Sequence, residues 1–142
     1  GVLARLVHHA TGVQAKAVDR LLRPVGATRI QVGVLQHASK AGVAMGTLAE
    51  RLDCHVSNLT GVVDRMQRQG LVRRQRAPRD RRSVLVRTTP EGERLRASLG
   101  LAVGDLQESL AGGLSARENK QLCVLLQKYI AGAEQMLDAR SE

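Results

Sequence analysis

The residues with the clearest chemical potential are arginines gathered in one stretch of the chain. Between Arg65 and Arg82 the sequence holds eight arginines and one acidic residue, Asp80, so this stretch carries most of the formal net charge of +9. Guanidinium groups at this density bind phosphates, because each combines a permanent charge with several hydrogen-bond donors. A nucleic acid is the expected partner, although an anionic membrane surface, or solvent alone, would also suit a basic face.

The other candidate chemistry lies in a short run of ligand-type residues. Cys54 stands between Asp53 and His55, while His8 and His9 are adjacent to each other. Neighbouring residues point apart and no second cluster has zinc-site spacing, so we expect no metal and no cofactor. A thiolate at Cys54 would make a redox sensor, but packing as a small apolar residue is favoured there. No glycine-rich phosphate loop, carboxylate pair or nucleophile motif is visible, and we expect no enzyme.

The composition limits the fold and the compartment. A chain of 142 residues with 43% hydrophobic residues can form a domain core. Only 1% of the residues are aromatic, so aliphatic side chains must fill that core, which favours helices over a β-sandwich. Cys54 and Cys123 are too few for a disulfide framework, and no apolar run approaches the length that spans a bilayer. We therefore expect a mainly α, cytoplasmic protein with no membrane partner.

Two predicted helices lead into the basic stretch. A short helix from about Met45 to Leu52 is followed by a tight turn at Asp53 and Cys54, and then by a longer helix from about Val56 to Gln69. This is the spacing of a helix-turn-helix. Gly70 would end the second helix in a left-handed conformation. The side chains expected to face inward are Leu48, Leu52, Leu59, Val62 and Met66.

A β-hairpin is predicted directly after these helices. Residues 71–76 and 83–88 are two short extended runs, and the second is apolar and β-branched. The loop between them, residues 77–82, contains Pro78 and Asp80, which suit a loop tip. A hairpin in this place is a wing.

The remaining sequence predicts helices on both sides of this unit. One runs from about Leu3 to Pro24, and a second, capped by Thr28, runs to about Ser39. Thr89 and Pro90 begin a helix that continues to about Ala111. Ser115 and Glu118 form a capping box for the last one. The terminal helices have apolar faces that neither can bury alone, which favours pairing with a second subunit. We thus expect dimerisation helices at 1–25 and 113–142, a winged helix-turn-helix DNA-binding domain at 26–90, and a long connecting helix at 90–112.

Several short motifs occur in a characteristic order. They are Leu48-Ala49-Glu50-Arg51-Leu52, Leu59-Thr60 with Val63-Asp64-Arg65-Met66, Gly70-Leu71-Val72, and Asp80-Arg81-Arg82 followed by Thr89-Pro90-Glu91-Gly92. At this order and spacing, residues 26–95 resemble the MarR family of winged helix-turn-helix transcription regulators. Ala44, where the family commonly has a Thr or Ser cap, and Asp53, where glycine is commoner, depart from the pattern.

The resemblance implies a homodimer that binds double-stranded DNA sequence-specifically. The resemblance further implies that this dimer represses a promoter through a pseudo-palindromic site and is released by a small-molecule effector. The residues implied for the recognition helix are Val56, Ser57, Asn58, Thr60, Gly61 and Arg65. In the wing, Asp80 is expected to orient Arg82 toward the minor groove, and the residues expected to meet phosphates are Arg73, Arg74, Arg76, Arg79 and Arg81. The effector pocket would involve His9, Val13 and His37.

Two alternatives stay open at this point. A sequence-neutral basic DNA-binding protein would have the same arginines and the same salt dependence, but would not discriminate between sequences. A redox-sensing regulator would act through Cys54.

Overall fold

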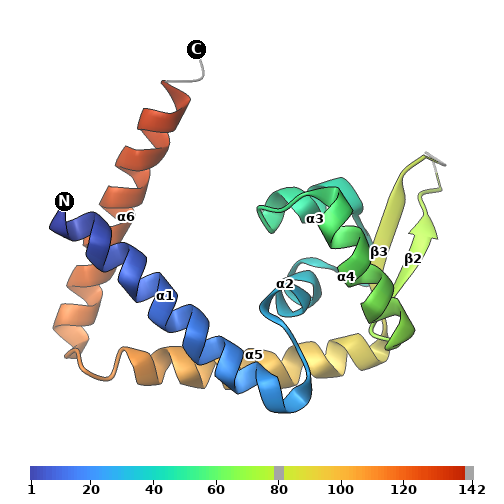
Figure 1. Cartoon of the computed structure of the whole chain (residues 1–142), viewed down its shortest axis with the longest axis horizontal. Coiled ribbons are helices and arrows are strands. Elements are labelled where there is room, and N and C mark those ends of the chain that lie inside the picture. The colour runs from blue at the N-terminus through green and yellow to red at the C-terminus, as the bar shows by residue number, and fades with distance from the viewer. Residues whose placement is uncertain (79–81, 140–142) are drawn as a thin grey trace. The chain divides into compact units, whose positions relative to one another are not determined.

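The computed structural model describes residues 1–78 and 82–139, and the chain divides into two compact units, residues 1–106 and 107–142. The elements are α1 (Val2–Leu22), the 3-10 turn η1 (Arg23–Val25), α2 (Arg29–His37), β1 (Val43–Ala44), α3 (Met45–Arg51), α4 (Val56–Arg68), β2 (Val72–Arg76), β3 (Val84–Thr88), α5 (Pro90–Leu110) and α6 (Ala116–Asp138) (Figure 1). The expectation of a mainly α chain with a small hairpin is confirmed.

The main core lies where α2, α3 and α4 meet the sheet. Leu48, Leu59 and Met66 are fully buried there, as predicted. The predicted Leu52 and Val62 are half-buried and pack against this cluster, and α4 also buries Val63 fully, which was not predicted. Residues 59, 63 and 66 follow the four-then-three spacing of one helix face, whereas residue 62 lies beside that face.

Helix α2 ends earlier than its apolar pattern indicates. Its start is the predicted one, since the Thr28 hydroxyl and the Gln31 side chain form a complete capping box. The helix stops at His37 instead of continuing to about Ser39, because Ala38 is extended and the Ser39 carbonyl accepts a hydrogen bond from the Thr88 N–H over 3.2 Å. Residues 38 and 39 therefore cannot continue the helix, because Ser39 pairs with the main chain of β3.

The sheet has three antiparallel strands in the order β1-β3-β2. β2 and β3 form the predicted hairpin, with Val72 opposite Thr88 and Arg76 opposite Val84. Strand β1 was not predicted, and it pairs Val43 with Val86. Two residues are too few to show the alternating pattern by which a strand is recognised in a sequence.

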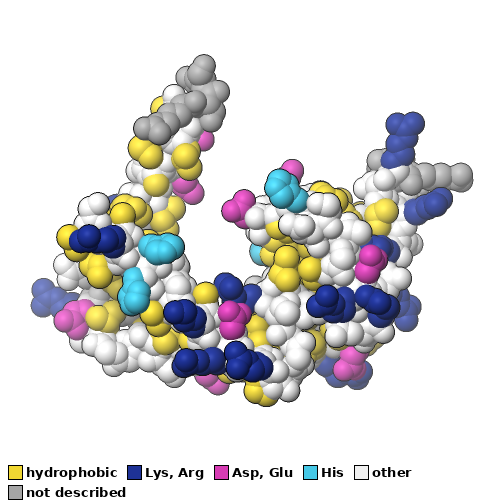
Figure 2. All heavy atoms as spheres, in the orientation of Figure 1, with side chains coloured by type: hydrophobic (Ala, Val, Ile, Leu, Met, Phe, Trp, Pro, Cys, Tyr) yellow, Lys and Arg dark blue, Asp and Glu magenta, His cyan; other side chains and the backbone are white. Residues whose placement is uncertain are grey.

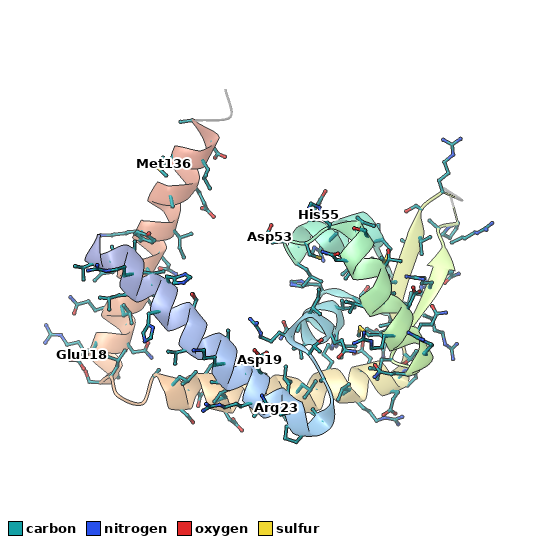
Figure 3. All side chains as sticks on the ribbon, in the orientation of Figure 1. Asp19, Arg23, Asp53, His55, Glu118 and Met136 are labelled. Carbon is teal, nitrogen blue, oxygen red and sulfur yellow. The ribbon has the colours of Figure 1, made fainter. Side chains whose placement is uncertain are left out.

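A smaller core joins α1, α2 and the first half of α5. Leu22, Val32 and Leu99 are buried together, and Val18 and Leu95 pack against them. The side chains of Asp19 and Arg29 form an ion pair over 2.8 Å (Figure 3 labels Asp19). This second cluster connects the first half of α5 to the helix that precedes the helix-turn-helix.

The unit of residues 107–142 contains the end of α5 and the whole of α6. The Ser115 and Glu118 capping box is present as predicted, and Glu118 lies at the start of α6 in Figure 3. Within this chain α6 buries no residue. Its large exposed apolar side chains are Leu122, Val124, Leu125, Tyr129, Ile130, Met136 and Leu137. In the described part of the chain, no helix combines the length and the apolar character that crossing a membrane requires.

Candidate nucleic-acid interface

A tight turn joins α3 to α4. Asp53 occupies the left-handed region with φ 47°, which glycine adopts most readily and which asparagine and aspartate adopt more often than other residues. The turn is closed by the Cys54 N–H, which donates to the Ala49 carbonyl over 3.0 Å. Asp53 and His55 are both exposed at this turn (Figure 3). As expected for Ala44, no side chain caps the start of α3.

Helix α4 places most of its predicted contact residues on its outer side. Its inner side carries Leu59, Val63 and Met66, all fully buried. The exposed predicted residues are Val56, Ser57, Asn58, Gly61 and Arg65, and Thr60 is half-buried. The Thr60 hydroxyl donates to the Val56 carbonyl over 2.8 Å, which occupies that hydroxyl within the helix. The structure therefore gathers these residues on one exposed helix surface, as a recognition helix requires.

The hairpin presents arginines beside this helix. Arg73 and Arg76 on β2 are exposed, as is Arg82 just before β3. The Ala77 N–H donates to the Ser83 carbonyl over 2.9 Å and continues the pairing toward the tip. Arg79, Asp80 and Arg81 lie outside the described residues, so the expected orientation of Arg82 by Asp80 stays a prediction. Figure 2 shows dark blue side chains around α4 and the hairpin, and a second group near the end of α1.

Arg74 differs from the other arginines of β2. Its guanidinium forms an ion pair with the Asp64 carboxylate, and its Nη2 donates to the Thr60 carbonyl over 3.1 Å. Its side chain is 28% exposed. Its expected phosphate contact competes with these partners, both of which belong to α4.

A groove of about 460 Å³ runs between α4, the start of α3 and the hairpin. Its lining residues are Ala44, Met45, Gly46, Val56, Thr60, Arg74, Arg82, Ser83 and Val84. Four of the predicted site residues are among them, which means that the recognition helix and the wing face one shared hollow. The described lining holds Arg82 together with Arg74, which is paired with the Asp64 carboxylate.

The three effector candidates come from two helices, α1 and α2. His9 and Val13 are exposed on α1, and His37 is half-buried at the end of α2. A small cavity of about 40 Å³ in this unit is lined by other residues: Val25, Gly26, Ala27, Gln31, Val32, Leu35, Gln69, Leu71, Leu95 and Leu99. The role of His9, Val13 and His37 stays a prediction.

Cys54 packs against the main core as a half-buried side chain. This placement supports the packing interpretation over a redox-sensing one. Across residues 1–78 and 82–139, no three His, Cys, Asp or Glu side chains are grouped closely enough to hold a metal ion.

Two polar contacts that support this interface were missed by the sequence analysis. The Arg87 guanidinium donates twice to the Ala41 carbonyl, over 3.2 and 3.1 Å, and fastens β3 to the loop before α3. The Gln31 side-chain amide donates to the Gln69 side chain over 3.2 Å, between α2 and the end of α4. The partners are 46 and 38 residues apart in the chain, so no local pattern could have revealed them.

Comparison with known proteins gives one consistent result. A family model described as "MarR family" matches residues 38–84. The multiple antibiotic resistance protein MarR of Salmonella typhimurium is 30% identical over 130 residues, which is 90% of each chain. A mutant of MarR from E. coli, solved in complex with operator DNA, superposes with a TM-score of 0.77 at 30% identity, over 89% of this chain and 92% of that one. CouR from Rhodococcus jostii RHA1, bound to p-coumaroyl-CoA, superposes with a TM-score of 0.74 at 28% identity, over 89% and 90%.

Proposed function

This chain belongs to the MarR family of winged-helix transcriptional regulators, and from that premise we propose that it is a homodimeric repressor of a pseudo-palindromic operator, released by a small-molecule effector. One observation carries the DNA-binding part. Val56 and Thr60 of α4 and Arg82 of the hairpin line one groove, and the other arginine in its described lining, Arg74, is paired with Asp64. A relative of the same fold was solved with operator DNA.

The exposed apolar residues of the terminal helices support the homodimer. In α1 they are Val2, Leu3, Leu6 and Val13, and α6 has seven more between Leu122 and Leu137. Exposed apolar side chains in this number on each helix mark an interface, and a second copy of the chain is the simplest partner that carries the matching surface. Two identical domains then read two half-sites about 10 to 10.5 bp apart.

The effector part rests on a likeness to a relative and on the predicted pocket residues. CouR was solved with p-coumaroyl-CoA. In this chain His9, Val13 and His37 are the residues we assign to an effector, and His9 and His37 offer ring nitrogens that bind an anionic group. Titration of p-coumaroyl-CoA and of small carboxylic acids into the preformed DNA complex tests this part. Release of DNA supports it when His9→Ala or His37→Ala abolishes the release.

The decisive experiment compares two duplexes at one salt concentration. One is the DNA upstream of the gene for this chain, and the other is the same DNA with its sequence scrambled. We expect the first to bind about a thousandfold or more tightly, with two protomers per duplex. Equal affinity for both duplexes would show a sequence-neutral basic DNA-binding protein instead, and would exclude the repressor.

The dimer is tested by a matched pair of substitutions in α6. Leu125→Asp removes an apolar residue from the exposed stripe, whereas Gln127→Asp introduces the same charge at an exposed polar position of the same helix. We expect a monomer in light scattering for Leu125→Asp and a dimer for Gln127→Asp. If both variants stay dimeric, this stripe of α6 is not the interface.

A further inference from the structure

We propose that Arg74 is a positioning residue for DNA recognition: it fixes the wing against the recognition helix instead of binding a phosphate. The inference rests on the proposed function, because it explains how two elements can read one operator together. It assigns to Arg74 a role different from that of its neighbour Arg73 in the same strand.

Three contacts bind Arg74 to α4. Its Nη1 pairs with the Asp64 carboxylate, and its Nη2 donates to the Thr60 carbonyl over 3.1 Å. The main-chain N–H of Arg74 donates to the Gln67 side-chain oxygen over 3.2 Å. Residues 60, 64 and 67 lie four and three residues apart, so they form one stripe along the helix. A single residue of β2 therefore holds about two turns of α4.

The alternation of the strand separates Arg74 from Arg73. Successive side chains of a strand point to opposite faces, and here Arg74 faces α4 and is 28% exposed, while Arg73 is exposed. The planar guanidinium reaches a carboxylate and a carbonyl at once, which a lysine ammonium cannot reproduce with the same geometry. The orientation of β2 against α4 therefore depends on the planar geometry of the guanidinium as well as on its charge.

The contact between Arg74 and the Thr60 carbonyl matters for DNA binding because of where Thr60 lies in α4. Thr60 lies one residue before Gly61, among the residues expected to approach DNA, and its carbonyl is held from β2. The same hairpin carries Arg82 at its tip end, and both Arg74 and Arg82 line the groove with Thr60. The distance between the recognition helix and the wing is thus set through Arg74. Operator recognition requires both to engage at once, whereas non-specific binding depends mainly on charge.

The charge balance also argues against a phosphate contact. Arg74 and Asp64 form a pair of zero net charge, so DNA gains little by binding the arginine unless the pair breaks. The paired carboxylate would then face the phosphates alone. A phosphate-binding Arg74 would be improved by removal of Asp64, and a positioning Arg74 would be impaired by it.

The test uses Arg74→Lys, Asp64→Asn and, as a matched control, Arg73→Gln, in the full chain. For Arg74→Lys we expect at least a tenfold loss of operator affinity, scrambled-duplex affinity within about threefold of wild type, and an unchanged slope of log affinity against log salt. Asp64→Asn is expected to weaken operator binding in the same way. Arg73→Gln should weaken both duplexes equally and reduce the slope by about one.

Two results would overturn the assignment. One is an Arg74→Lys variant with the wild-type ratio of operator to scrambled affinity, and the other is an Asp64→Asn variant that binds operator more tightly. The ion pair between Arg74 and Asp64 is also tested without DNA, from the free energies of unfolding of Arg74→Lys, Asp64→Asn and the double variant. We expect the two losses of stability to be non-additive. Additive losses would refute the contact. If wild type itself shows no operator preference, the proposed function has failed, and this cycle still tests whether Arg74 holds α4.

Discussion

The Thr89 hydroxyl donates to the Gly70 carbonyl over 2.6 Å, joining the residue before α5 to the glycine that ends the recognition helix. The same oxygen accepts from the Gly92 N–H over 3.0 Å and so caps α5. Gly70 has φ 73°, which lets the chain reverse direction after α4. The connecting helix is therefore anchored directly to the end of the recognition helix.

Replacing Thr89 with Val tests this anchor. Valine keeps the shape but cannot cap α5 and leaves the Gly70 carbonyl without its hydroxyl partner. We expect the free energy of unfolding to fall by about 1.5 to 3 kcal/mol, from the lost cap and the lost hydrogen bond. Urea denaturation at a fixed protein concentration measures it. The control is Ser98→Ala on the exposed side of α5, and a loss as large in Ser98→Ala would show that the anchor is not responsible.

Gly92 is expected to tolerate no side chain. An added Cβ would lie 2.1 Å from the Leu71 carbonyl oxygen, which is backbone and cannot move aside cheaply. Gly92→Ala should destabilise by about 1 to 3 kcal/mol through overpacking, despite the better helix propensity of alanine. On the same helix Gly100→Ala meets nothing within 4 Å, and we expect it to be neutral or to stabilise by up to about 1 kcal/mol. Equal thermal shifts for the two variants would contradict this close approach.

Asp53 holds the turn of the helix-turn-helix in a left-handed conformation, with φ 47°. Asp53→Gly should raise the free energy of unfolding by about 0.5 kcal/mol, because relief of the left-handed strain slightly exceeds the added entropy of the unfolded chain. Asp53→Val should lower it by about 1 to 2 kcal/mol, since a β-branched residue fits this region poorly. Thermal denaturation of both variants checks the opposite signs, and the same sign for both would show that the backbone is not the cause.

Arg82 tests the wing. On the implied minor-groove contact, Arg82→Ala should weaken operator binding about tenfold or more, in keeping with about 1 to 3 kcal/mol for a lost base contact. Dimer mass and helical content should stay at wild-type values. Arg117→Ala removes the same charge from an exposed position of α6 and should leave operator binding nearly unchanged. Normal binding by Arg82→Ala would mean that the assignment to Asp80 and Arg82 is wrong.

The capping box of α6 predicts a pH dependence. The hydroxyl and then the main-chain N–H of Ser115 hold the pKa of the Glu118 carboxyl below its ordinary value, because both donate to the carboxylate. A lowered folded pKa contributes stability above the ordinary glutamate value of about 4.3, and this contribution is lost as the pH falls through the folded value. An NMR titration of the Glu118 carboxyl should show the low pKa, and Ser115→Ala should raise it toward the ordinary value. An identical titration in both proteins would contradict the capping contact.

Local patterns in the sequence predict most of the fold. Apolar spacing predicts α1 and α4, the Thr28 and Ser115 caps mark the starts of α2 and α6, and Gly70 marks the end of α4. Each of these features depends on residues within about four positions of each other, so the sequence alone contains the information. The apolar spacing did not reveal that Val63 is fully buried beside the half-buried Val62. The family motifs also identified the exposed face of α4 as the candidate site.

The tertiary structure decided which polar groups are already engaged. The sequence determined that arginines are concentrated after the recognition helix, but not that Arg74 is bound to Asp64 and Thr60 while Arg73 is exposed. It also did not reveal that Arg87 holds the Ala41 carbonyl, or that β1 pairs with β3. The physical reason is that hydrogen-bond partners and strand neighbours are chosen by proximity in space, which side-chain types and local spacing do not encode. The composition of the interface was readable from the chain, and its division into exposed and engaged arginines came only from the packing of β2 against α4.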